Sequence, residues 1–187
     1  IIHDGSAETV EVKIVRAKIQ LRDSEAKGKI IEHQLGADSK TYKVGIINLP
    51  SFYMDMEAAR KGVKDYRSTT RDVRVIIDGF KKDGVDAIVM DLSTNGGGSL
   101  TEAIDLTGLF IDQGTVVQVK SPSGEVQQYD DRNPGTAWDG PLVVVCSKFS
   151  ASASEIFAGA IADYDRGIVV GDSATHGKGP VQSLLEL

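Results

Sequence analysis

The first third of the chain carries two strand-like patterns separated by a polar stretch. Over 9–21, TVEVKIVRAKIQL, apolar residues alternate with polar ones, and this period of two predicts a half-buried strand. The segment 23–41 is polar and contains glycine, which predicts a loop with a short strand at most. The segment 43–52, KVGIINLPSF, predicts a further strand that Pro50 closes, because proline cannot donate to a strand ladder.

A helical pattern follows these strands. Over 68–84 apolar residues recur at helical spacing, with Thr69 or Thr70 as the expected N-cap and Gly84 as the expected end. The next segment, VDAIVMDL at 85–92, is almost wholly apolar. A short apolar run of this kind is typical of a strand buried on both faces.

Helices and short apolar strands alternate in the remainder of the chain. The pattern predicts helices over 100–110 and 154–164, strands over 115–120, 141–146, 167–171 and 181–187, and polar connections over 121–140 and 172–179. This alternation favours an α/β fold around a mainly parallel or mixed sheet. In such folds, reactive groups gather in the loops that leave the carboxyl ends of the strands.

Composition excludes several classes of protein. The 187 residues include 27 acidic and 21 basic side chains, a net charge of −6, with no basic block, so nucleic acid is not an expected partner. Cys146 is the single cysteine and stands in an apolar run, which excludes an intrachain disulfide and predicts a buried thiol. No apolar stretch approaches the ~18 residues of a membrane-spanning helix.

Three loops could carry chemistry: 93–99 (STNGGGS), 147–154 (SKFSASAS) and 172–179 (DSATHGKG). Successive glycines in the first loop let the backbone turn sharply and present N–H groups to an anionic atom. The spacing of a nucleotide-binding loop is absent, which leaves an oxyanion hole or a tight strand-to-helix turn.

The second loop sets Ser150, Ser152 and Ser154 at alternating positions before a predicted helix. Ser152, followed three residues later by Glu155, fits a capping box. A serine at the start of a helix, among small residues and near free backbone N–H groups, also suits a nucleophile. Both interpretations of Ser152 remain open from the sequence.

A serine nucleophile needs a base, and the chain offers few. His3 and His33 lie far along the chain from the glycine and serine loops. His176 could be a base, a substrate contact or a surface residue. Lys178, between two glycines, could act as a base only if burial kept it uncharged, and is otherwise a solvated loop lysine. The amide of Gln182 could orient that lysine.

Together, the three loops resemble those of the C-terminal processing peptidases, a family that includes the tail-specific proteases. The matching motifs are DLSTNGGGSLTEA at 91–103, FSASASEIFAGAIADYDR at 149–166 and VVGDSATHGKGPVQS at 169–183. The resemblance implies that Ser152 is the nucleophile of a serine endopeptidase and that Lys178 is its general base.

The resemblance also assigns supporting roles. Gln182 matches the position that holds the lysine in place, and the backbone N–H groups of Ala153, Gly98 and Gly97 match the oxyanion hole. Asp163 matches an acidic position that has been considered functional, but its place in the last turn of a helix favours an ordinary exposed residue.

The family's fold is a mixed α/β core of the crotonase and Clp protease type, accompanied by a PDZ domain. Residues 1–20 resemble the last strand of that PDZ domain, and 21–187 resemble a protease core cut short at its C-terminus. The chain starts and stops within a pattern and lacks a signal peptide, so we interpret it as an excised fragment. The resemblance implies protein substrates with apolar C-termini, a periplasmic or otherwise exported location, and no metal or cofactor; it names no adaptor.

Two features depart from the family pattern. Ser93 stands where the family commonly has an arginine, which puts the rigidity of the glycine loop in doubt. The third loop is one residue longer than usual and has His176 where phenylalanine is common. Two alternatives therefore stay open: a catalytically impaired relative that binds peptides, and a crotonase-like acyl-CoA enzyme.

Overall fold

The computed structural model describes residue 13 and residues 24–35 and 40–180. In chain order these residues form β1 (Lys27–Leu35), β2 (Lys40–Asn48), α1 (Met56–Arg60), α2 (Thr69–Lys82), β3 (Ala87–Asp91), α3 (Leu100–Thr107), β4 (Gly114–Lys120), β5 (Val126–Asp131), β6 (Leu142–Cys146), α4 (Ala153–Asp163) and β7 (Ile168–Gly171). No helix among them is both long enough and apolar enough to cross a membrane.

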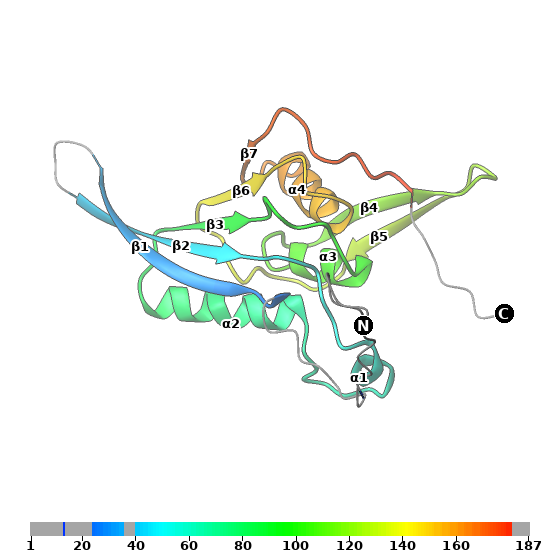
Figure 1. Ribbon diagram of the computed structural model, residues 1–187, viewed down its shortest axis with the longest axis horizontal. Helices are drawn as coiled ribbons and strands as arrows, with labels where there is room; N and C mark the ends of the chain where they lie inside the picture. The colour runs from blue at the N-terminus through cyan, green and yellow to red at the C-terminus, as the bar shows by residue number, and fades with distance from the viewer. Residues whose placement is uncertain (1–12, 14–23, 36–39, 181–187) are drawn as a thin grey trace, which may run out of the picture.

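Five strands form one sheet in the order β1-β2-β3-β6-β7 (Figure 1). β2, β3, β6 and β7 run parallel to one another, and β1, at the edge of the sheet, is antiparallel to β2. The mixed α/β sheet predicted from the sequence is therefore confirmed. The carboxyl ends of β3, β6 and β7 lead into the glycine, serine and lysine loops, which brings the three loops to one edge of the sheet.

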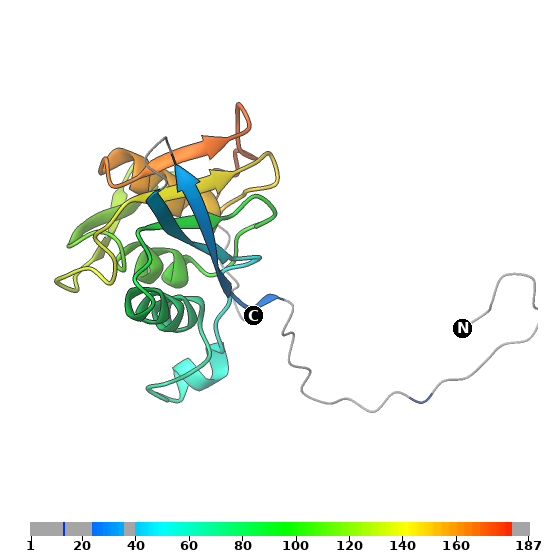
Figure 2. The same ribbon diagram turned by 90° about the vertical axis from the view of Figure 1, so that its left-hand side faces the viewer.

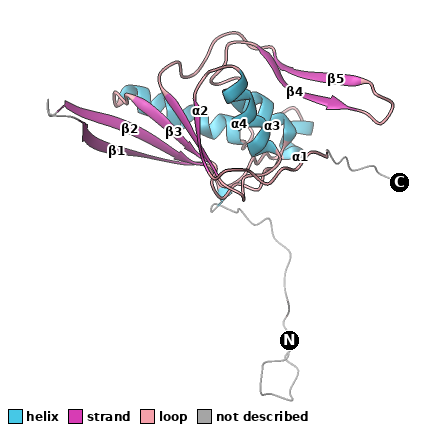
Figure 3. Ribbon diagram, turned by 90° about the horizontal axis from the view of Figure 1, so that it is seen from above, coloured by secondary structure: helices cyan, strands magenta, loops and turns pink. Residues whose placement is uncertain are grey.

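The helices cover one face of this sheet. Figures 2 and 3 show α2, α3 and α4 on the same side of the strands, with the β4–β5 hairpin beyond the helices. Along β3, Ile88 and Met90 are fully buried whereas Val89 is partly exposed. The prediction that 85–92 is buried on both faces is therefore wrong: in the described residues only one face of β3 meets helices.

Helix α2 shows why glycine occurs in the two strands beneath it. A Cβ on Gly28 or Gly45 would overlap the side chains that α2 lays on β1 and β2, among them Phe80. The helix is as predicted, but its N-cap is Ser68, whose hydroxyl accepts a hydrogen bond from the Arg71 N–H at 3.2 Å. Thr69 is buried and receives the N–H of Tyr53 instead.

The remaining predicted elements stand within a few residues of their expected positions, with three additions. The stretch 23–41 contains the nine-residue strand β1, the polar connection 121–140 contains β5, and α1 was not predicted at all. β1 and β5 expose most of their side chains, so neither shows the alternation that marks a half-buried strand. The strands predicted over 9–21 and 181–187, and the PDZ strand, lie outside the described residues.

A pocket of about 410 Å³ between α2 and α3 brings three acidic side chains together with three basic ones. Glu102 is almost fully buried in it and accepts two hydrogen bonds from Thr70, both at 2.8 Å. Asp131 is buried beside α3. Desolvation, with the charges of Glu102 and Asp131, raises the pKa of Asp105 from 3.8 to about 6. Lys64, Arg71 and Arg74 also line this pocket.

The raised pKa of Asp105 predicts a pH-dependent stability. The stability linked to its protonation is present below pH 3.8 and is lost as the pH rises through about 6, because the folded chain then holds a poorly solvated charge. We therefore expect Asp105→Asn to raise the melting temperature at pH 7.5 and to change it little at pH 4. Thermal denaturation at both values measures this, with the exposed Asp78→Asn as control. Equal effects at the two pH values would contradict the prediction.

Candidate active site

Ser152 stands on a sharp turn between β6 and α4. Its backbone has φ 58° and ψ −114°, a combination that residues other than glycine rarely adopt. A strained strand-to-helix turn of this kind holds a serine at the start of a helix, the arrangement of a nucleophile elbow. The sequence pattern around Ser152 did not reveal this backbone strain.

The two outer serines have structural contacts. The hydroxyl of Ser150 donates to the carbonyl oxygen of Leu92 at 2.7 Å, and that of Ser154 donates to the carbonyl oxygen of Asn95 at 2.9 Å. Both serines are fully buried, whereas Ser152 is partly exposed. Ser150 and Ser154 therefore fasten the serine loop to the glycine loop and leave Ser152 as the candidate nucleophile.

Asn95 organises the glycine loop, a role that sequence reasoning missed. It is fully buried; its side-chain amide donates to the Leu49 carbonyl oxygen at 2.8 Å, and its Oδ1 accepts the Gly97 N–H at 2.8 Å. The Gly97 N–H is thus engaged within the loop. Gly98 and Ala153 remain as the candidate oxyanion donors.

The glycine loop touches the serine turn directly. Gly97 has φ +103°, and a Cβ there would lie 2.7 Å from the Ala151 carbonyl oxygen and 2.8 Å from Cβ of Ser152. On its other side the loop is bonded to Phe52, whose N–H donates to the Gly97 carbonyl oxygen at 2.9 Å. Only glycine fits between these two segments.

Glu155 joins the serine turn to the lysine loop. Its carboxylate accepts the N–H of Ser152 at 2.7 Å, the hydroxyl of Thr175 at 2.7 Å, and the N–H groups of Gly177 at 2.5 Å and Lys178 at 3.0 Å. Burial alone would raise the pKa of Glu155, but these four hydrogen bonds outweigh it and lower the pKa. Glu155 makes its half of the capping box predicted for α4 by accepting the Ser152 N–H, and the same carboxylate also holds the lysine loop.

The candidate residues line a common cleft of about 690 Å³. Its walls include Gly98, Ser152, Ala153 and Lys178, with four consecutive residues of β4 opposite. The Lys178 side chain is exposed, and no hydrogen bond joins it to Ser152. The cleft therefore brings together the predicted nucleophile, base and oxyanion donors, with the lysine still solvated.

The other predicted residues lie elsewhere. His176 is exposed, does not line the cleft, and donates its backbone N–H to the Ser150 carbonyl oxygen at 3.0 Å. Asp163 is the exposed last residue of α4 and is also outside the cleft lining. Gln182 lies beyond the described residues. Ser93, in the place of the expected arginine, bonds to Asp91 at 2.6 Å through its hydroxyl.

A second bond braces the glycine loop at Ser93. The hydroxyl of Ser147, in the serine loop, donates to the Ser93 carbonyl oxygen at 2.5 Å. The loss of an arginine at this position is therefore offset by contacts that hold the start of the loop to its neighbours.

A comparison with protein-family models decides the relationship. Residues 43–187, more than half of the chain, match the model of peptidase family S41. The chain belongs to this family. The family predicted from the three loops is thereby confirmed.

Individual relatives agree with this S41 assignment. The chain is 37% identical over 171 residues to the tail-specific protease of Haemophilus influenzae, covering 91% of this chain and 22% of that protein. It is 36% identical over 153 residues to the chloroplastic carboxyl-terminal-processing peptidase 2 of Arabidopsis thaliana, covering 81% and 27%. The chain thus spans about a quarter of the length of these relatives.

Solved structures confirm the fold of this S41 chain. The photosystem II D1 C-terminal processing protease superposes with a TM-score of 0.69 at 25% identity, covering 92% of this chain and 42% of that one. Mature CPAF superposes with a TM-score of 0.60 at 15% identity, covering 83% and 42%, and supports the fold alone.

Gly97 gives a stringent test of the contact between the two loops. We expect Gly97→Ala to cost about 3 kcal/mol in the free energy of unfolding, because its Cβ would clash with Ala151 and Ser152 in a strained backbone conformation. Chemical denaturation measures the loss. Gly96→Ala is the matched control: a Cβ there meets nothing within 4 Å, so a change of at most about 0.5 kcal/mol is expected. Equal losses in both variants would contradict the described contact.

Glu155 gives a test of the bridge to the lysine loop. We expect Glu155→Ala to destabilise the fold by about 2 kcal/mol and to speed hydrogen exchange at the Gly177 and Lys178 amides, which lose their acceptor. Because the folded pKa of Glu155 is lowered, its stabilisation is present above pH 4.5 and disappears as the pH falls through the lowered value. Glu125→Ala, at an exposed site in the β4–β5 turn, is the control. Unchanged exchange at Gly177 and Lys178 would refute the bridge.

Proposed function

We propose that this chain carries the active site of a serine endopeptidase in which Ser152 is the nucleophile and Lys178 the general base. The observation that supports this most is the strained backbone of Ser152 at the mouth of α4. A cap needs no such strain, because caps normally adopt extended backbone angles. A reactive serine gains exposure and a neighbouring N–H from it.

In the proposed reaction, Oγ of Ser152 attacks the carbonyl carbon of the substrate while Lys178 takes the hydroxyl proton. The charge that develops on the carbonyl oxygen is stabilised by the N–H groups of Gly98 and Ala153. Lys178 then returns the proton to the leaving amine, and an acyl-enzyme remains on Ser152. A water molecule, deprotonated by the same lysine, releases the second product.

Lysine can take this proton only when its amine is uncharged, and desolvation favours that form. The Lys178 side chain is exposed, so we propose that substrate in the cleft covers it and completes the arrangement. Glu155 limits the movement required, since it already holds the Lys178 N–H at 3.0 Å. Gln182 is proposed to fix the lysine amine in the closed state.

The proposal extends to substrate and location by analogy with the relatives. One relative is a carboxyl-terminal-processing peptidase and another a tail-specific protease, so we propose polypeptides recognised through apolar C-termini as substrates. A periplasmic or otherwise exported location and a PDZ strand at residues 1–20 are proposed on the same resemblance.

A serine-directed fluorophosphonate, followed by mass spectrometry of the modified peptide, tests the chemistry. We expect labelling at Ser152, abolished in Ser152→Ala, and cleavage of an unstructured protein slowed more than about a thousand-fold in both Ser152→Ala and Lys178→Ala. Ser123→Ala and Lys81→Ala, at exposed sites outside the cleft, are the controls. Labelling elsewhere, or full activity in Lys178→Ala, would refute the assignment.

The same samples separate the two alternatives. A peptide-binding relative without activity would bind peptide in the cleft and leave Ser152 unlabelled. A crotonase-like acyl-CoA enzyme would show a higher melting temperature with acyl-CoA, because a ligand that binds the folded chain stabilises it.

A further inference from the structure

A second hollow, of about 650 Å³, adjoins the catalytic cleft. The two share Gly98 and Leu100 as walls, so the strip that carries a proposed oxyanion donor separates them. The lining of the second hollow includes Phe52 and Met54 from the segment that leads into α1, and Met56, the first residue of α1. Met56 is 59% exposed although it is large and apolar.

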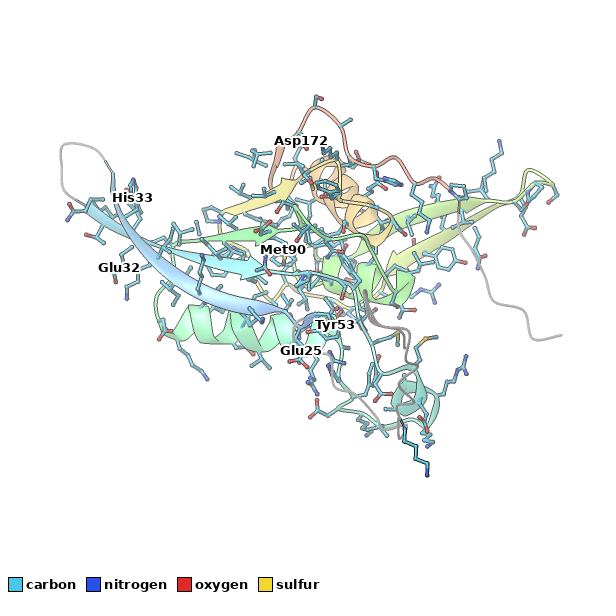
Figure 4. The ribbon with its side chains drawn as sticks, in the orientation of Figure 1. Glu25, Glu32, His33, Tyr53, Met90 and Asp172 are labelled. Atoms are coloured by element: carbon cyan, nitrogen blue, oxygen red, sulfur yellow. The ribbon has the colours of Figure 1, made fainter. Side chains whose placement is uncertain are left out.

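Hydrogen bonds tie the wall of this hollow to the oxyanion strip. The Ser99 N–H donates to the Phe52 carbonyl oxygen at 2.8 Å, and the Ser99 hydroxyl donates to the sulfur of Met54 at 3.1 Å. Tyr53, which lies between Phe52 and Met54 in the chain, is labelled in Figure 4. Its hydroxyl donates to Asp72 at 2.7 Å and holds the ring in place. A ligand in this hollow would therefore lie against backbone that is bonded directly to the residues flanking Gly98.

We propose that this hollow is a specificity subsite for an extended polypeptide, and that it receives one bulky apolar side chain close to the bond that is cut. This rests on the proposed function, since the cleft must hold the reacting carbonyl. A chain with its carbonyl oxygen at Gly98 continues across the shared strip into the hollow. Methionine side chains are unbranched and adaptable, so Met54 and Met56 can accommodate apolar groups of different shapes.

The charge of the lining indicates which substrate residues should stand next to that apolar residue. Arg60 is the single charged residue among those that line the hollow, and its side chain has no ion pair with any described residue. An acidic residue beside the apolar one would be attracted and a lysine repelled. The subsite therefore selects an apolar side chain flanked by an acidic rather than a basic residue.

The three methionines of the chain provide the test. Met54 and Met56 line the hollow, whereas Met90 is fully buried in the core near the centre of Figure 4 and serves as an internal control. In Ser152→Ala with ¹³C-methyl-labelled methionine, we expect a Leu-Asp peptide to shift the Met54 and Met56 signals and not that of Met90. A peptide with serine in place of leucine should bind at least about fivefold more weakly, since it lacks an apolar group to bury.

Three protein variants sharpen the result. Met56→Glu should abolish the preference for leucine, whereas Val126→Glu, at a 51% exposed apolar site outside both hollows, should keep it. Replacing the aspartate of the peptide by lysine should weaken binding on the order of threefold, and Arg60→Gln should remove that difference.

Backbone amide signals of Gly98 and Ala153 report separately on the cleft. Shifts at these amides with unmoved Met54 and Met56 signals would overturn the subsite and leave the proposed function standing. Shifts of the methionines alone would overturn the continuity of the two hollows. No shift at either place with a saturating peptide would contradict both proposals.

Discussion

The carboxylate of Glu155 is the interaction on which the arrangement of the site depends. Among the described residues it is the one side chain that binds both the backbone of the Ser152 turn and the backbone of the lysine loop. The loop follows β7, whose four residues are all exposed, so little packing holds it in place. An ionised carboxylate with four donors makes stronger bonds than a neutral group would, and this compensates for the missing packing.

The strain at Ser152 is maintained by the elements around it. α4 begins immediately after this residue, and its buried stripe anchors the turn from one side. From the other side, Ser150 and Ser154 bind carbonyl oxygens of the neighbouring loop. A residue in a sparsely populated conformation persists only where its surroundings determine it more than once, as they do here. The strained backbone of Ser152 lowers the stability of the fold, and the buried hydrogen bonds of Ser150 and Ser154 offset this loss.

Sequence reasoning predicted the loops that line the cleft better than the periphery of the fold. The strands before the three loops have apolar runs, two of them half-buried in β3 and β6 and one exposed in β7, and the motifs between them are specific. β1 and β5 could not be found because their side chains are mostly exposed and their pairing is set by partners elsewhere in the chain. The role of Asn95 depends on Leu49, 46 residues away, and no local pattern encodes that contact. The engagement of the Gly97 N–H likewise follows from a side-chain bond rather than from the glycine motif itself.

In our proposal, Gly98 links the reacting carbonyl to the recognition of the substrate. A Cβ at this position would overlap the Phe52 carbonyl oxygen, so the backbone of the strip is pressed against the segment that forms the second hollow. This close contact leaves little room for the two segments to move independently. Filling the second hollow would therefore favour the strip geometry that the oxyanion requires, and an empty hollow would leave it less constrained. Under this proposal, a contact that is stronger in the transition state than in the bound substrate would raise the rate of the reaction as well as the affinity.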